Sequence, residues 1–127
     1  MVTPKVAAAI KELEDAFGTA AVTTKEDGQG GTLAVVDPVP LGPPYVQGDT
    51  WVGFHITHLH PQADIYPLHV RGDLRRTDGV GLGAATSASS FDGRPSIQLS
   101  RRTNHLDPET FSALMKLDHV IAWLLAK

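Results

Sequence analysis

Cysteine is missing from the 127-residue chain. Without a thiol, the chain forms no disulfide, offers no thiolate to a metal ion and has no cysteine nucleophile. Long hydrophobic runs are missing too, so we expect no membrane-spanning helix. The first residues mix lysines and acids on a helical pattern, which is unlike a signal peptide. Together these absences favour a cytoplasmic protein without membrane contact.

Three kinds of site lack their usual sequence signals. No Gly-x-Ser-x-Gly motif is present, so a serine nucleophile is not indicated. Gly79, Gly81 and Gly83 are spaced like a phosphate-binding loop, but neither a helix pattern nor a lysine follows them. We therefore predict a flexible loop over residues 79–93. Aromatic residues make up only 6% and the net charge is −3, which disfavours a nucleic-acid surface.

The remaining composition is that of an ordinary globular domain. Apolar residues make up 42% and charged residues 20% of the chain, and the length fits one domain over residues 1–127. Residues 1–70 have a net charge of −5 and residues 71–127 of +2, with all six arginines between Arg71 and Arg102. These arginines could face an acidic partner, or could lie on a solvated surface with local ion pairs.

Helical patterns occur at both ends of the chain. Thr3-Pro4 is typical of an N-cap and first helical residue, and Gly18 is typical of a helix end. Between them, apolar residues recur at helical spacing: Val6, Ile10, Leu13 and Phe17. Asp107-Pro108-Glu109 predicts the start of a second helix, whose wide apolar stripe continues to the C-terminus.

Strand patterns lie between the helices. We predict strands at 20–25, 32–36 and 50–56, with a hairpin turn at 26–31, because these runs are β-branched or aromatic and are separated by glycines. Residues 69–74 favour a further short strand, and 96–99 could be strand or turn. The sequence therefore predicts an α+β fold with an N-terminal helix, an antiparallel β-meander and a C-terminal helix packed on the sheet.

Histidines are concentrated between residues 55 and 70. His58 and His60 would share one face of a strand and His55 the other. With His69 or Asp64 as a third ligand, His58 and His60 could form an open zinc or iron site. Alternatively, they are turn and surface histidines that form hydrogen bonds with the backbone.

A basic segment precedes the last helix. Arg101 and Arg102 are followed by Asn104 and His105, just upstream of a predicted helix N-terminus that itself favours anions. This segment could contact a carboxylate or phosphate, or could serve only in helix capping and surface ion pairing.

Several of these motifs together resemble the ubiquitin-conjugating (UBC-like) superfamily, in particular divergent bacterial members. Tyr66-Pro67-Leu68-His69-Val70 is similar to the family's Tyr-Pro-x-x-Pro-Pro-x-Val turn, with His69 where proline is usual. Asp92-Gly93-Arg94-Pro95-Ser96-Ile97-Gln98-Leu99 resembles its active-site segment, Asn-Gly-x-Ile-Cys-Leu. The last helix is similar to the family's Trp-Ser-Pro…Leu…Leu-Leu helix. The family's His-Pro-Asn tripeptide is missing before the active-site segment.

Gln98 stands where the family has its thioester-forming cysteine, and glutamine cannot act as that nucleophile. The resemblance therefore implies a non-catalytic UBC-like module without a cofactor, which binds a ubiquitin-like protein or an activating enzyme in a bacterial ubiquitin-like system. The candidate binding residues are Tyr66, Pro67, Gln98, Arg101, Arg102 and His105. Two alternatives remain: a small metal- or histidine-dependent enzyme that uses the His55–His60 cluster, and a structural subunit that pairs through its C-terminal helix.

Overall fold

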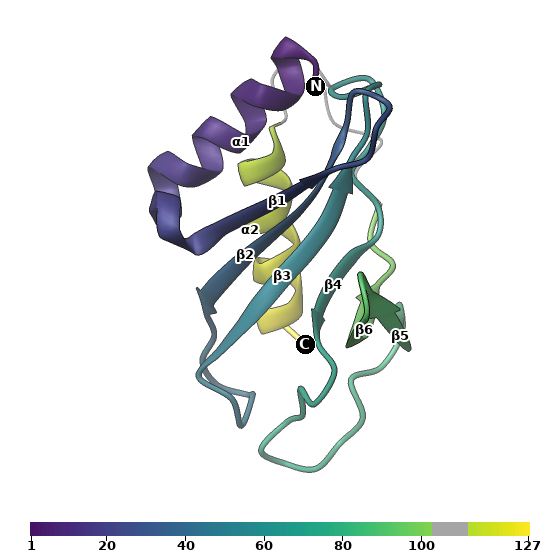
Figure 1. Ribbon diagram of the computed structural model, residues 1–127. Helices are drawn as coiled ribbons and strands as arrows, with labels where there is room; N and C mark the ends of the chain where they lie inside the picture. The colour runs from purple at the N-terminus through teal and green to yellow at the C-terminus, as the bar shows by residue number, and fades with distance from the viewer. Residues whose placement is uncertain (103–111) are drawn as a thin grey trace.

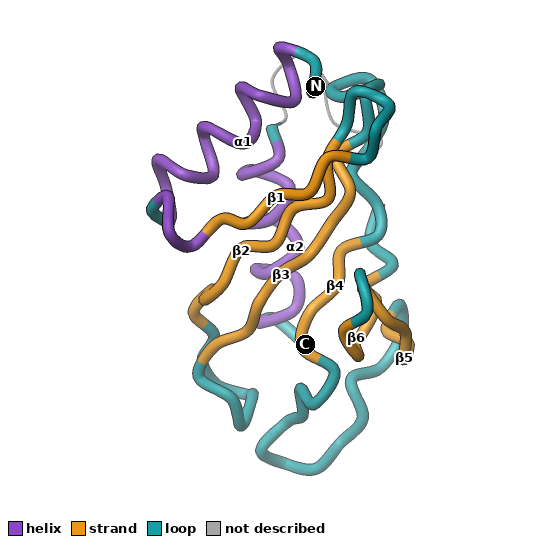
Figure 2. Tube along the Cα trace, in the orientation of Figure 1, coloured by secondary structure: helices purple, strands orange, loops and turns teal. Residues whose placement is uncertain are grey.

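The computed structural model describes residues 1–102 and 112–127, which form two helices on one face of a six-stranded antiparallel sheet (Figure 1). The strand order is β1-β2-β3-β4-β6-β5. In chain order the elements are α1 (Pro4–Phe17), β1 (Val22–Glu26), β2 (Thr32–Pro40), β3 (Asp49–Ile56), β4 (Leu68–Arg71), β5 (Thr86–Phe91), β6 (Arg94–Leu99) and α2 (Ala113–Leu125). The predicted α+β architecture is confirmed, and Figure 2 shows α2 behind the sheet and α1 beside it, next to β1.

Helix α1 begins and ends where the sequence predicts. The Thr3 hydroxyl accepts a hydrogen bond from the Val6 N–H at 3.2 Å, which satisfies one of the free donors of the first turn. Gly18 follows the last turn with a φ of 95°, a conformation that favours glycine. The predicted strand start at Ala20 is wrong, because residues 19–21 form a short 3-10 turn before β1.

The first four strands form a meander with one buried and one open face. Alternate residues of β2, β3 and β4 point toward the helices, and the core contains Ala34, Val36, Val52, Phe54, Ile56, Leu68 and Val70. Strand β2 continues past the predicted end at Val36, after a register shift between Val36 and Val39. Leu33, Val35 and Trp51 lie on the face away from the helices and remain half-buried.

The predicted loop over residues 79–93 is wrong in its second half, where Thr86–Phe91 forms strand β5. Strands β5 and β6 form a hairpin, and β6 inserts between β5 and β4. The two turn residues, Asp92 and Gly93, have φ values of 48° and 83°. Positive φ at both residues is typical of the type I′ turn, which is common in two-residue hairpins. The serine-rich sequence of β5 has no apolar alternation, so only this turn and the pairing with β6 identify it as a strand.

The tip of this hairpin folds over the open face of the sheet. The Phe91 ring covers Gly53 of β3 and lies 5.0 Å from the His69 ring. Asp92 forms an ion pair with Lys25 of β1 at 3.2 Å, although β1 is the opposite edge strand. The two last strands therefore curl across the sheet and bury part of its second face.

Helix α2 packs on α1 and the sheet. Its N-cap is Ser112, whose hydroxyl accepts from the Met115 N–H at 3.2 Å. The predicted start at Asp107-Pro108 lies outside the described residues. Within 1–102 and 112–127, neither helix combines the length and apolar character that a bilayer crossing needs.

The contact between Phe91 and Gly53 predicts that Gly53→Ala destabilises the protein. A Cβ at residue 53 would lie 2.7 Å from two ring carbons of Phe91, so the hairpin would have to shift. We expect a loss of about 1–3 kcal/mol in the free energy of unfolding, measured by urea denaturation.

Gly48→Ala is the matched control, because no atom lies within 4 Å of a Cβ there. In a Phe91→Ala background the Gly53→Ala substitution should cost much less, since the clashing ring is gone. An equal cost in both backgrounds would contradict the predicted clash.

Candidate functional site

The predicted Tyr-Pro turn and the predicted basic segment meet in space. Leu68 of β4 pairs with Leu99 of β6, so the residues before β4 lie beside those after β6. The guanidinium carbon of Arg102 lies 3.9 Å from the centre of the Tyr66 ring, a cation–π contact. Tyr66 is half-buried and Arg102 is exposed, so the pair is accessible from solvent.

Arg101 points toward the C-terminal helix. Its guanidinium carbon lies 5.7 Å from the centre of the Trp123 ring. Its Nε is buried and has no hydrogen-bond partner among the described residues. Its backbone carbonyl accepts a hydrogen bond from Lys116 Nζ at 2.7 Å, which links the basic segment to α2.

Gln98 lies on β6, where it pairs with His69 of β4 and Ser87 of β5. Its side-chain amide donates to the Ser100 hydroxyl at 3.2 Å. The predicted binding residues Tyr66, Pro67, Arg101 and Arg102 thus meet at the paired ends of β4 and β6, with Gln98 further along β6. His105 lies outside the described residues. We call the group Tyr66, Pro67, Gln98, Arg101 and Arg102 the Tyr66–Arg102 surface.

A buried ion pair lies beneath this surface. Lys116 is only 1% exposed, and its Nζ lies 3.1 and 3.2 Å from the two carboxylate oxygens of Asp64. Burial lowers the pKa of Lys116, and the Asp64 carboxylate opposes this by favouring the charged ammonium. Asp64, a candidate metal ligand in the sequence, thus forms an ion pair with a lysine. The sequence does contain a signal for this pair, because Lys116 falls on the apolar stripe of α2.

The four central histidines lie in three separate settings. Strand β3 ends at Ile56, so His58 and His60 belong to the following turn and do not share a strand face. His69 lies on β4, where its Nδ1 forms a 3.0 Å hydrogen bond with the Ser96 hydroxyl beneath Phe91. Burial lowers the pKa of both His60 and His69, which favours their neutral forms. Among residues 1–102 and 112–127, no three His, Asp or Glu side chains gather as a metal-binding group.

His55 forms a dyad with an aspartate that the sequence does not single out. Its Nε2 lies 2.7 Å from Asp27 Oδ2, and Asp27 Oδ1 accepts from the N–H groups of Gln29 and Gly31 at 2.7 and 3.0 Å. The His55 hydrogen bond, followed by that of Gln29, lowers the pKa of Asp27 to about 2. Only the hairpin pairing of β1 with β2, and of β2 with β3, brings these residues together.

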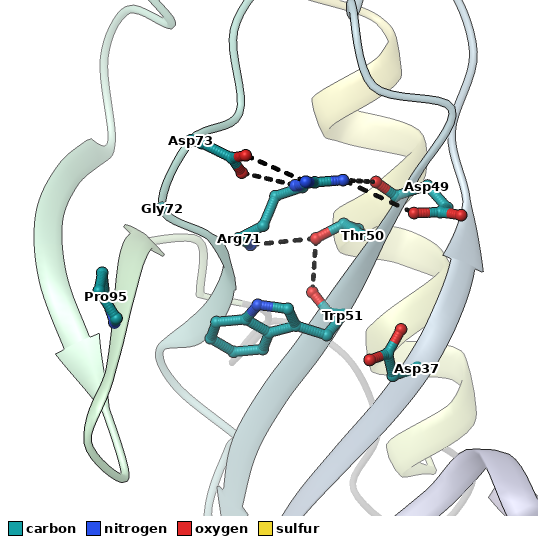
Figure 3. Close-up of a pocket in the computed structure, with 8 residues that line it drawn as sticks. All are labelled: Asp37, Asp49, Thr50, Trp51, Arg71, Gly72, Asp73 and Pro95. Carbon is teal, nitrogen blue, oxygen red and sulfur yellow. Dashed lines mark hydrogen bonds and ion pairs between the residues drawn. The ribbon is translucent and has the colours of Figure 1, made fainter.

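A second site, which sequence reasoning missed, opens at the other end of β4. It is a cavity of about 660 Å³ on the open face of the sheet, within the usual size range of ligand pockets (Figure 3). Its walls include the Trp51 indole and Pro95 of β6. The full lining is Asp37, Asp49, Thr50, Trp51, Arg71, Gly72, Asp73 and Pro95.

One arginine and three aspartates are the charged residues that line this pocket. Arg71 donates from Nε and Nη2 to the two oxygens of Asp73 at 2.6 and 3.0 Å, and from Nη1 to the Asp49 carbonyl at 3.1 Å. Figure 3 shows the guanidinium held between these two residues. Because Arg71 is already paired, the pocket favours cationic over anionic groups.

Comparison with known proteins does not identify the chain. No family model matches it, and no significant match was found among curated proteins or among solved structures. The resemblance to the UBC-like superfamily therefore stays a prediction. Function has to be inferred from the side chains and their geometry.

Loss of the buried lysine should strongly destabilise the protein. Lys116→Met leaves the Asp64 carboxylate, which is 10% exposed, without its ammonium partner. We expect a loss of about 3–5 kcal/mol in the free energy of unfolding, measured by urea denaturation.

Lys11→Met is the control, because Lys11 forms an exposed ion pair with Asp15 on α1. We expect it to cost at most about 0.5 kcal/mol. Replacing both partners, in Asp64→Leu/Lys116→Met, should recover part of the loss, since no buried charge is left alone. Similar effects of the two lysine substitutions would rule out the buried pair as a main stabilising contact.

The dyad predicts a specific change in an aspartate pKa. In the folded protein the Asp27 carboxyl should titrate at about 2, and in His55→Ala its pKa should rise toward 3.8 without reaching it, because two backbone N–H groups remain. The measurement is the pH dependence of the carboxyl carbon shift by NMR.

The lowered pKa also gives the sign of the pH effect. The dyad stabilises the folded state above the unfolded-state pKa of about 4, and this contribution is lost as the pH falls through the folded-state pKa. Asp73 is the internal control: Arg71 lowers its pKa, and this pKa should not change in His55→Ala. An unchanged Asp27 pKa in the variant would argue against the dyad.

Proposed function

We propose that this chain is a non-catalytic UBC-like module that recognises a protein of a bacterial ubiquitin-like system. The observation that carries the proposal is the meeting of Tyr66 with Arg102 at the paired ends of β4 and β6. The partner is a ubiquitin-like protein or its activating enzyme. The arginines of the Tyr66–Arg102 surface favour an acidic patch on that partner.

The order of elements supports the UBC-like part of the proposal. A helix leads into a four-stranded meander, and Tyr66-Pro67 stands directly before β4. An Asp92-Gly93 turn then leads into the strand that carries Gln98, and a helix closes the chain. The same succession underlies the resemblance drawn from the sequence motifs.

The chemistry of Gln98 supports recognition rather than thioester transfer. An amide is not a nucleophile, and the Gln98 amide donates to the neighbouring Ser100 hydroxyl. By contrast, Tyr and Arg are the side chains that most often dominate binding energy at protein interfaces. The Arg102 guanidinium already lies over the Tyr66 ring, which reduces the conformational entropy that the side chain loses when a partner binds.

A histidine-dependent activity is the second candidate, and the dyad of Asp27 and His55 favours it. An aspartate that orients an imidazole is a common arrangement in acid–base catalysis. Metal analysis of untagged protein tests the metal-dependent form of this activity. Stoichiometric zinc or iron that is lost in His58→Ala/His60→Ala would favour the metal-dependent form of this activity.

The binding proposal is tested with purified ubiquitin-like protein and activating enzyme, by titration calorimetry. We expect Arg102→Ala to weaken binding by about 10- to 30-fold, a loss of about 1.4–2 kcal/mol, and Arg101→Ala/Arg102→Ala to weaken it further. Arg102→Lys should recover only part of the affinity, because an ammonium does not stack flat on the Tyr66 ring.

Arg75→Ala is the matched control, since Arg75 is an exposed arginine in the connection after β4 and should leave the affinity unchanged. Absence of binding to both partners would refute the proposal. Equal losses in Arg75→Ala and Arg102→Ala would show that only overall charge matters and not the Tyr66–Arg102 surface.

A further inference from the structure

Strand β5 forms one outer edge of the sheet, and in the part of the chain that the structure describes this edge lacks the usual protection. Among the described residues, β6 is the only strand that pairs with β5 (Figure 1). Residues 86–91 contain no charged residue and no proline, and residues 87–90 are exposed. Natural proteins usually protect such an edge with charges, proline or a bulge, because it can pair with another strand.

The hairpin geometry shows which backbone groups point outward. In a two-residue hairpin, the residues that flank the turn exchange both backbone hydrogen bonds, so Phe91 and Arg94 form such a pair. At the other end of the hairpin the Ser100 N–H donates to the Ala85 carbonyl at 2.8 Å. This bond fits the same alternation, in which every second residue of β5 is hydrogen-bonded to β6. Thr86, Ala88 and Ser90 therefore direct their N–H and C=O groups away from β6.

The opposite edge of the sheet is protected, which makes the bare edge of β5 distinctive. Strand β1 carries Lys25 and Glu26. Lys25 forms an ion pair with Asp92 at 3.2 Å, and the N-terminal ammonium of Met1 lies against the Glu26 carboxylate. Charges of this kind oppose strand addition at β1.

We infer that the free edge of β5 pairs with β5 of a second copy of this chain, in a two-fold antiparallel dimer. The register that uses every outward group places Ala88 opposite its symmetry mate and Thr86 opposite Ser90 of the other copy. Antiparallel pairing of a strand with itself satisfies two-fold symmetry, which is the commonest symmetry of protein dimers. The two sheets then form one continuous sheet.

A second copy fits this edge better than a charged or bulky peptide does. The side chains that would lie opposite one another across the contact are those of Ala, Ser and Thr, so neither like charges nor large groups oppose close approach. In both copies Thr86, Ala88 and Ser90 direct their backbone N–H and C=O groups outward. In this register each of these N–H groups lies opposite a C=O group of the other copy. The inference does not depend on the proposed function.

The molar mass in solution tests this inference. The chain has a mass of 13.6 kDa, and sedimentation should show a shift toward twice that value with increasing concentration. A contact through one strand belongs to the small, weak class of interfaces, so the series should extend to about 0.5 mM. A wild-type protein that stays monomeric over this range would overturn the inference.

Two substitutions of Ala88 place the contact on β5. Ala88→Pro removes an N–H that has no partner among residues 1–102 and 112–127, so the hairpin should persist while the dimer is lost. Ala88→Lys would bring two like charges face to face and should weaken dimerisation at least tenfold, which provides a second variant if the proline variant fails to fold.

Thr24→Pro is the matched control on β1. The Asp27 N–H donates to the Gly31 carbonyl, so Thr24, three residues earlier, directs its own N–H outward from the sheet in the same way as Ala88. This variant should remain a dimer. A folded Ala88→Pro protein with unchanged dimerisation, or an equal loss in Thr24→Pro, would show that β5 is not the contact.

Discussion

The buried ion pair between Lys116 and Asp64 connects the parts of the fold that carry the candidate site. Lys116 belongs to α2 and Asp64 to the connection between β3 and β4, and the lysine also donates a hydrogen bond to the Arg101 carbonyl. A charge this deeply buried is tolerated only when its partners are held in place. The pair therefore sets the position of the residues around Tyr66 and Arg102 relative to the helix.

Strand β4 separates two regions of opposite charge. At its start, the Tyr66–Arg102 surface presents Arg102 over the Tyr66 ring. At its end, Arg71 is neutralised by Asp49 and Asp73, and the pocket beside Trp51 has an excess of carboxylates. Along the sequence, residues 1–70 are acidic and residues 71–127 are basic. In space the charges are arranged differently, because the meander places Asp37 and Asp49 beside Arg71.

Local signals predicted the elements that depend on neighbours in sequence. Thr3, Pro4 and Gly18 delimit α1 as expected, since capping and glycine effects act within one helical turn. Strand β5 was missed, because a run of serines has no hydrophobic period and becomes a strand only by pairing with β6.

The sequence by itself determined that thiol chemistry is absent, that helices flank a strand meander, and that Tyr66-Pro67 and Arg101-Arg102 were candidates for binding. Only the tertiary structure decided that Arg102 lies on Tyr66, that Asp64 serves Lys116, and that His55 pairs with Asp27. The physical reason is that each of these contacts depends on strand register or helix docking. Register and docking are set by burial of the whole core, which no short motif records.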